Sequence, residues 1–248
     1  MYEGIKKIAK KVIPSSFIKK HETKLRNLVA LTYKGNKYQC NICQQNLSKF
    51  VTLNNGQELC PNCGCLPRTR RLFAEIEAIE NQPSQTILHF SPPKSLRNKL
   101  STLPLKSYTT TDYEGEFDAD KKLNIENIEE PDNQYDHIIC YHVLEHIPND
   151  RLAMQELFRI LKPNGTCYIQ TPFKAGEIYE DNTITSKQER LKHFGQDDHV
   201  RIYSVNGLQK RLEKAGFTVE INKLEQNAPH KNGFMDGDIM LKAKKIIN

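Results

Sequence analysis

The chain has 248 residues, of which 38% are hydrophobic, and a formal net charge of +6. That length allows one α/β domain of about 150–200 residues with a smaller appended unit, and the composition argues against disorder throughout. No run of about 18 apolar residues is present, which excludes a transmembrane helix, and the N-terminus lacks the apolar core of a signal peptide. We therefore expect a cytoplasmic protein whose paired cysteines bind metal rather than form disulfides.

The positive charge is concentrated in residues 1–37, which hold ten Lys and Arg against two Glu, whereas the remainder has 26 basic and 28 acidic residues. Apolar residues of this arm share one face of a helix that ends at Pro14, with lysines opposite. Such a basic amphipathic helix is typical of packing on its own protein, of peripheral membrane contact through residues 1–20, or of binding to nucleic-acid phosphates. A second helix is expected from Phe17 to Tyr33.

Two cysteine pairs follow in the pattern C-x2-C-x16-C-x2-C, formed by Cys40, Cys43, Cys60 and Cys63. Four thiolates on two tight knuckles fill the shell of a structural zinc and leave no position open for catalysis. A redox pair is the alternative, but neither pair has thioredoxin-like surroundings. Cys65 is interpreted as a bystander, with replacement of Cys63 as the alternative. The sequence thus predicts an arm at 1–37, a zinc ribbon at 38–67 and a larger domain at 68–248.

The larger domain begins with an amphipathic helix preceded by three arginines, Arg68, Arg70 and Arg71. They either grip a phosphate-bearing ligand or cap the junction with the ribbon. An apolar strand spans Thr86–Phe90, and a second strand from Leu105 to Thr111 ends at Asp112. In dinucleotide-type folds an acid about 20 residues past the first βα turn binds the ribose diol. Asp112 lies 22 residues after Phe90, so it is the candidate, although such an Asp is also a common turn former.

A strand, a helix and a second strand follow within residues 136–172. Ile138–Tyr141 is rich in β-formers, Leu152–Leu161 has helical spacing that a Pro-Asn-Gly breaker ends, and Thr166–Thr171 is again β-like. This βαβ unit requires parallel strands. Because ligands of open sheets bind beyond the carboxyl ends of the strands, Tyr141–His146 is expected at the mouth of a site.

The segment His142-Val-Leu-Glu145-His146 matches H-x-x-E-H, the inverted zinc-protease motif. That motif needs a helix carrying both histidines one turn apart, whereas His142 follows directly on a strand and Pro148 permits only a short turn. Catalytic zinc hydrolysis is therefore not favoured. We expect these side chains to line a pocket, with one imidazole as the base for a hydroxyl or amine. Capping of the next helix by Glu145 and His146 is the structural alternative.

The last third of the chain begins with a long polar segment, Phe173–Tyr203, that has little regular signal. Its place just after a strand end favours a lid over the site. A helix from Ser204 to Ala215 follows, with Gly216 at its C-cap, and then strands near Phe217–Lys223 and Asp238–Lys244.

The stretch DHIICYHVLEHIPNDRLAMQELFRILKPNGTCYIQTP resembles the fourth and fifth strands of class I S-adenosylmethionine-dependent methyltransferases of the type 11-like group. Their usual form is FDxVxxxxxLEHxxD…ExxRxLKPGGxxxxxxP, and the match extends more loosely from Thr86 to Lys244. The resemblance implies an α/β, Rossmann-like fold with helices on both faces of a seven-stranded sheet in the order 3-2-1-4-5-7-6, the seventh strand antiparallel. It also implies S-adenosyl-L-methionine as the methyl donor.

By this resemblance the cofactor-binding residues are His89, Phe90, Ser91, Asp112, Asn124, Ile125, Tyr141 and His142. Asp112 would hold the ribose, and Asn124 with the Ile125 backbone would meet the adenine. Tyr141 and His142 would flank the methionine portion. Two departures stand out: the first loop, His89-Phe-Ser-Pro-Pro-Lys, has no glycine, and an Asn replaces the usual adenine-contacting acid.

The loops around Tyr179 and Asp198 resemble those of a subset with a four-cysteine ribbon, associated with saccharides or other cell-envelope components. We expect methyl transfer to an oxygen or nitrogen of a saccharide or another small-molecule acceptor, with His142, His146 or His199 as base. An RNA methyltransferase is one alternative, which the near-neutral main domain disfavours. A non-catalytic module that binds RNA or an anionic surface, with a degenerate methyltransferase fold, is the other, and the glycine-free loop favours it.

Overall fold

A computed structural model describes residues 15–77, 79, 82–225 and 230–246. The predicted basic helix before Pro14 lies outside these residues. The chain forms two compact units, each built from three stretches: Met1–Glu80, Pro93–Leu103 and Leu224–Asp238 in the first, and Asn81–Pro92, Pro104–Lys223 and Ile239–Asn248 in the second. No helix in the described part of the chain is long and apolar enough to cross a membrane.

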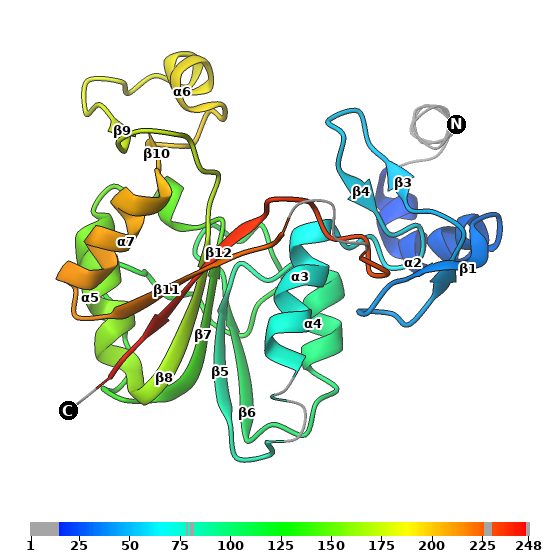
Figure 1. Ribbon diagram of the computed structural model, residues 1–248, viewed down its shortest axis with the longest axis horizontal. Coiled ribbons are helices and arrows are strands. Elements are labelled where there is room, and N and C mark those ends of the chain that lie inside the picture. The colour runs from blue at the N-terminus through cyan, green and yellow to red at the C-terminus, as the bar shows by residue number, and fades with distance from the viewer. Residues whose placement is uncertain (1–14, 78, 80–81, 226–229, 247–248) are drawn as a thin grey trace. The chain divides into compact units, whose positions relative to one another are not determined.

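The second unit is organised around a six-stranded sheet with the order β11-β12-β8-β7-β5-β6 (Figure 1). Its strands are β5 (Thr86–Phe90), β6 (Ser107–Thr111), β7 (Tyr135–Tyr141), β8 (Leu161–Gln170), β11 (Thr218–Lys223) and β12 (Ile239–Lys244). Strands β5 to β8 are parallel, whereas β12 is antiparallel to both of its neighbours. All five residues of β5 are buried, as its apolar sequence predicts.

This order confirms the predicted topology for six strands, including the antiparallel one. The strand expected at the outer edge is reduced, among the described residues, to one parallel bridge between Thr111 and Lys121. The intervening sequence, DYEGEFDADK, is rich in acids and contains a glycine, so it has neither the β-branched residues nor the alternation of a strand. The prediction of a seventh strand is corrected accordingly.

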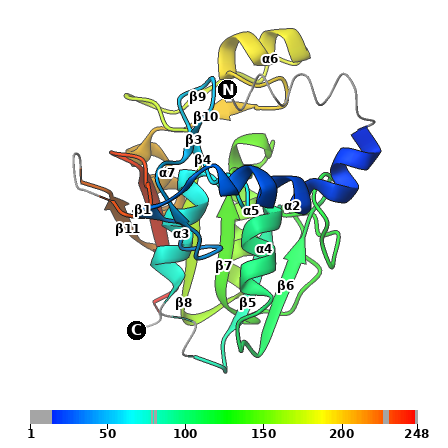
Figure 2. The same cartoon turned by 90° about the vertical axis from the view of Figure 1, so that its right-hand side faces the viewer.

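Helices α5 (Asp150–Ile160) and α7 (Val205–Lys214) pack against each other and against strands β8 and β11 (Figures 1 and 2). Each begins at a side-chain cap: Asn149 accepts from the Leu152 N–H, and Ser204 accepts from the Gly207 N–H. The apolar stripe of α5 is buried in the core of this unit, at Ala153, Met154, Leu157 and Ile160. The helix ends near the predicted breaker, at Ile160, but the Pro-Asn-Gly segment lies within β8, where Asn164 takes a left-handed φ of 63°. The predicted start of this strand at Thr166 is therefore wrong, because β8 begins at Leu161.

The segment predicted as an irregular lid contains regular structure. It holds a small antiparallel pair, β9 (Tyr179–Glu180) with β10 (Arg201–Ile202), and helix α6 (Lys187–Phe194), which are coloured yellow to yellow-green in Figure 1. Sequence signals for α6 were present: Ser186 caps the Glu189 N–H, and Gly195 ends the helix at a φ of 87°.

The first unit contains helix α2 (Ser15–Leu31), two short antiparallel pairs and helices α3 (Pro67–Ile76) and α4 (Lys94–Leu100). The pairs are β1 (Lys34–Gln39) with β2 (Asn46–Leu47), and β3 (Val51–Thr52) with β4 (Glu58–Leu59). Pro67 stands in the first turn of α3, where its missing N–H costs no hydrogen bond. These small pairs carry the two cysteine knuckles.

Candidate functional site

The register of the central strands brings the predicted cofactor residues to one edge of the sheet. Phe90 at the end of β5 pairs with Thr111 of β6 and with Cys140 of β7. Because these strands are parallel, Ser91 and Asp112, which follow β5 and β6, emerge at the same edge as Tyr141, the last residue of β7.

The first loop is built around a contact between Ser91 and Asp112. Ser91 has a left-handed φ of 46°, and its hydroxyl donates to Asp112 Oδ1 at 2.8 Å. The other oxygen of Asp112 accepts the Phe117 N–H at 3.2 Å. A carboxylate has about four acceptor positions, so two remain for a diol.

His89 and Phe90, two further predicted cofactor residues, lie inside the sheet rather than at its mouth. Their exposed fractions are 1% and 4%. The His89 ring contacts the Tyr108 hydroxyl at 2.9 Å, and burial lowers the pKa of His89 to about 3, so it is neutral. Only their backbone can meet a ligand at this edge.

Asn124 and Ile125 lie in the connection before β7. Asn124 is exposed and its side-chain oxygen accepts the Glu126 N–H at 3.0 Å, whereas Ile125 is buried in the core. The Thr111 hydroxyl accepts the Leu123 N–H at 2.9 Å, which ties this connection to the end of β6.

Tyr141 and His142 end β7, and their side chains take different directions. The Tyr141 hydroxyl contacts the sulfur of Met240. His142 has a φ of 55°, an uncommon conformation for a residue with a side chain, and its N–H donates to Gln170 O at 2.8 Å. The strained backbone at both Ser91 and His142 marks the two strand ends where the site is expected.

Beyond β7 the chain brings a carboxylate and three imidazoles together. His142 Nδ1 lies 3.2 Å from Glu145 Oε1, and the His146 and His199 rings meet edge to face with centroids 4.6 Å apart. Glu145 and His199 are 1% and 3% exposed. All three predicted catalytic histidines therefore belong to one cluster, although His199 is more than 50 residues away in sequence.

The motif H-x-x-E-H does not form the helix of a zinc protease. Its last three residues make a single turn of 3-10 helix, Leu144–His146, and His142 stands before it. Glu145, His146 and His199 each offer a ligand atom within 4.8 Å of the others. The imidazole pair that meets is thus His146 with His199, not His146 with His142.

A buried ionic network holds β10 and the loop residue His199 that precedes it. The Val200 N–H donates to Glu145 O at 2.9 Å, and the Arg201 guanidinium donates to the carbonyls of Leu144, Ile147 and Pro148. Arg201 also pairs with Glu180 at 3.0 Å. This clamp fixes the turn after β7 against β10.

Two pKa shifts describe the electrostatics of the cluster. Burial raises the pKa of Glu145, but the hydrogen bond and charge of His142 outweigh it, so the pKa lies below its usual value. Burial, with the neighbouring charge of His146, lowers the pKa of His199. At neutral pH the cluster therefore combines a carboxylate with a neutral imidazole.

The four predicted metal ligands, with Cys65, form a second cluster in the first unit. Sulfur atoms of Cys40 and Cys63 are 3.7 Å apart, and those of Cys43 and Cys60 are 3.8 Å apart. The Cys65 sulfur lies 3.4 Å from that of Cys40, so Cys65 is near the predicted ligands, and its interpretation as a bystander to the zinc stays a prediction. A group of four sulfur atoms within 4.8 Å of one another, close enough to bind one metal ion, comes from Cys40, Cys60, Cys63 and Cys65.

The two cysteine pairs lie in turns with the same backbone conformation. Gln44 and Gly64 have φ values of 59° and 75°, and their N–H groups donate to Cys40 O and Cys60 O. Arg70, one of the three arginines, is fully buried and donates to the carbonyls of Glu58, Cys65, Asn232 and Gly233. Arg70 is therefore a structural cap of the ribbon and not a phosphate ligand.

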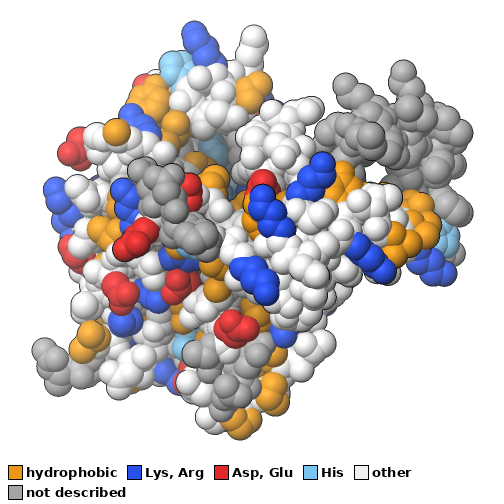
Figure 3. Space-filling model, turned by 45° about the vertical axis from the view of Figure 1, so that its right-hand side comes forward, with side chains coloured by type: hydrophobic (Ala, Val, Ile, Leu, Met, Phe, Trp, Pro, Cys, Tyr) orange, Lys and Arg blue, Asp and Glu red, His pale blue; other side chains and the backbone are white. Residues whose placement is uncertain are grey.

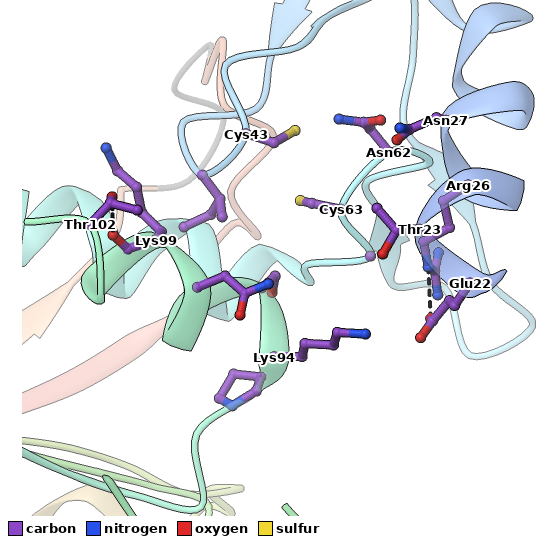
Figure 4. Close-up of a pocket in the computed structure, with 15 residues that line it drawn as sticks. Glu22, Thr23, Arg26, Asn27, Cys43, Asn62, Cys63, Lys94, Lys99 and Thr102 are labelled. Atoms are coloured by element: carbon purple, nitrogen blue, oxygen red, sulfur yellow. Dashed lines mark hydrogen bonds and ion pairs between the residues drawn. The ribbon is translucent and has the colours of Figure 1, made fainter. Parts of the chain in front are cut away.

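A cavity of about 500 Å³ lies beside the cysteines within the first unit (Figure 4). Arg26, Lys94 and Lys99 line it together with amide side chains such as Asn62, and Arg26 pairs with Glu22 at 2.9 Å. No sequence motif indicated this cavity. On the face drawn in Figure 3, basic and acidic side chains are interspersed.

Residues 66–221 match the family model described as "Methyltransferase domain". The chain belongs to this methyltransferase family. The family predicted from the sequence is thereby confirmed, and it supports S-adenosylmethionine as the cofactor.

Two curated relatives match part of this methyltransferase. The ubiquinone biosynthesis O-methyltransferase of Psychrobacter arcticus is 28% identical over 86 residues, 34% of each chain. A probable S-adenosylmethionine-dependent methyltransferase of Mycolicibacterium smegmatis is 31% identical over 100 residues, 39% of this chain and 34% of that protein. The chain thus spans about a third of the length of the curated relatives it matches.

A solved S-adenosylmethionine-dependent methyltransferase from Archaeoglobus fulgidus has the same fold. The two structures superpose with a TM-score of 0.50 at 18% sequence identity, over 72% of this chain and 93% of the other.

Proposed function

We propose that this methyltransferase transfers a methyl group from S-adenosylmethionine to an oxygen or nitrogen of a saccharide or another small-molecule or cell-envelope acceptor. The observation that carries the proposal is the shared edge where Ser91, Asp112 and the histidine cluster follow parallel strands. The name of the Psychrobacter arcticus relative, an O-methyltransferase, favours an oxygen acceptor.

In this proposal Asp112 accepts hydrogen bonds from the ribose diol of the cofactor. Its two unused acceptor positions suit a pair of vicinal hydroxyls. Asn124 and the Ile125 backbone meet the adenine, and the backbone of His89, Phe90 and Ser91 borders the cofactor. Tyr141 and His142 border the methionine portion.

The reaction is an in-line displacement. A lone pair of the acceptor forms a bond to the methyl carbon, and the electrons of the breaking carbon–sulfur bond stay on sulfur, which becomes a neutral thioether. The acceptor's proton passes to a base, for which His142, His146 and His199 are the candidates. The protein's main contribution is to align the two partners and exclude water.

The cysteine cluster is proposed to hold a structural Zn²⁺ through Cys40, Cys43, Cys60 and Cys63. A tetrahedron of sulfurs about 2.3 Å from zinc has edges of about 3.8 Å. The Cys40–Cys63 and Cys43–Cys60 separations of 3.7 and 3.8 Å fit such edges. A reducing cytoplasm, where we propose that the protein works, would keep these thiols available for metal.

Calorimetry with S-adenosylmethionine and its demethylated product tests the proposed activity. We expect binding with a dissociation constant of about 1 mM or tighter, and at least tenfold weaker binding by Asp112→Asn. Glu116→Gln, an exposed position in the loop after β6, is the matched control and should bind as wild type. Absence of binding of either molecule to the folded protein would overturn the proposal.

A further inference from the structure

Glu145, His146 and His199 converge on a common point in the second unit. Each offers one ligand atom, and these atoms lie within 4.8 Å of one another. Glu145 and His199 are almost fully buried, whereas the His146 side chain is 30% exposed. The cluster is therefore built into the turn after β7 and remains open on the His146 side.

Each of these side chains also has a polar contact to a neighbouring group. The His199 Nδ1–H donates to Phe194 O at 3.3 Å, and His146 Nδ1 lies 3.1 Å from Asp198 Oδ2. Glu145 Oε1 lies 3.2 Å from His142 Nδ1. Partners of this kind, a carbonyl or carboxylate behind each imidazole, orient histidines that bind metals and fix their tautomers.

Two buried acceptor atoms of this cluster lack a hydrogen bond. His199 Nε2 and Glu145 Oε2 are buried and have no hydrogen-bond partner among the described residues. With Nδ1 protonated, His199 Nε2 carries a lone pair, and a carboxylate only accepts. Buried acceptors that lack a donor destabilise the fold, and a cation bound by both would offset that cost.

We propose that Glu145, His146 and His199 bind a divalent cation. Two imidazoles and one carboxylate suit Mn²⁺, Fe²⁺, Co²⁺ or Zn²⁺ better than Mg²⁺ or Ca²⁺, which prefer oxygen ligands. Three protein ligands leave coordination positions open on the exposed side, as at catalytic rather than structural metal sites.

The role of this cation rests on the proposed methyl transfer. An acceptor hydroxyl bound to the cation has a lowered pKa, so its proton leaves to solvent water or to His142. The resulting oxygen lone pair forms the bond to the methyl carbon, and the carbon–sulfur electrons remain on sulfur. The acceptor class is then a hydroxyl compound, and His146 and His199 act as ligands, which leaves His142 as the candidate base.

Titration with Mn²⁺ of the full-length protein, loaded with no more than the one Zn²⁺ per chain that the four thiolates take and followed by electron paramagnetic resonance, tests the site. Mn²⁺ is chosen because thiolates bind it poorly, so the cysteine cluster does not compete. We expect one bound Mn²⁺ per chain, and at least tenfold weaker binding in Glu145→Gln and His199→Asn. His193→Asn, on the neighbouring helix α6 but outside the cluster, should bind as wild type.

Asp198→Asn provides a variant that does not disturb the core, because the Asp198 side chain is 56% exposed. Loss of this carboxylate behind His146 should weaken Mn²⁺ binding about 10–100-fold with an unchanged thermal midpoint. No Mn²⁺ binding by the folded wild type, or equal binding by all variants, overturns the inference. S-adenosylmethionine binding, measured on the same samples, separates this failure from failure of the proposed function.

Discussion

The Ser91 hydroxyl donates to Asp112 Oδ1 at 2.8 Å and thereby links the residue after β5 to the residue after β6. Ser91 does so from a left-handed conformation, in a loop where related methyltransferases usually have glycine. The hydrogen bond to a carboxylate contributes about 1.5–3 kcal/mol, which offsets a backbone cost of about 1–2 kcal/mol. Ser91 in this glycine-free loop therefore holds a left-handed conformation of the kind that glycine adopts most easily.

We predict that Ser91→Ala destabilises the protein more than Ser91→Gly does. Both changes remove the hydrogen bond to Asp112, but only glycine relieves the left-handed backbone, so the variants should differ by about 1 kcal/mol in the free energy of unfolding. Urea denaturation of the two variants measures this difference. Equal stabilities would show that the backbone at Ser91 carries no strain.

A second prediction concerns which four of the five clustered cysteines bind zinc. Both knuckle pairs have the same local geometry, with left-handed Gln44 and Gly64 beside them. We therefore expect Cys43→Ala to release zinc and Cys65→Ala to retain it. Metal content after dialysis against a chelator reports the outcome, and thermal denaturation should show a large loss of stability only for Cys43→Ala. The opposite pattern would make Cys65 the fourth ligand.

The sequence predicts those parts of the fold that depend on local pattern. Strand β5 follows from its run of Ile, Leu and Phe, and α5 from the helical spacing of its apolar residues, so periodicity suffices for both. The Ser186 cap and Gly195 also indicated helix α6, but its sequence is mostly polar and lacks the apolar periodicity that predicts a helix. The missing edge strand was predicted from the strand order of the family. The local composition of that segment does not favour a strand, and the structure follows the composition.

The site could be predicted only in part because it depends on tertiary contacts. Strand register predicts that Asp112 and His142 share an edge, but not that His199 reaches Glu145. That approach requires Arg201 to satisfy three carbonyls of the turn after β7, which no motif records. Cys65 is a similar case, since only the folded knuckles bring its sulfur beside Cys40.

A third prediction follows from the buried His89. Its pKa is lowered from 6.5 to about 3 by burial, so between these values the unfolded chain binds a proton that the folded protein does not. Stability therefore falls as the pH decreases from 6.5 towards 3, by up to about 1.4 kcal/mol per pH unit from this group. Unfolding free energies at several pH values should have a steeper slope in wild type than in His89→Gln. Parallel slopes would mean that His89 is not buried as a neutral ring.

The last prediction separates the clamp around Arg201 from cofactor binding. Arg201 is 5% exposed and donates to Leu144 O at 3.1 Å and Pro148 O at 2.8 Å, besides its ion pair with Glu180. Lysine keeps the charge but cannot reach several carbonyls from one planar group. We expect Arg201→Lys to lose about 2–4 kcal/mol of stability, because buried carbonyls lose their donors.

The clamp positions His199 and not Asp112. Arg201→Lys should therefore lower methyl transfer, or Mn²⁺ binding, about tenfold or more. The affinity for S-adenosylmethionine should stay within about twofold of wild type. Arg151→Lys, an exposed arginine on α5, is the control and should change none of these quantities. Calorimetry with the cofactor and resonance with Mn²⁺ on the same folded samples distinguish the two effects. A parallel loss of both affinities would mean that the clamp supports the whole edge of the sheet, since a local displacement of β10 leaves the Ser91–Asp112 contact intact.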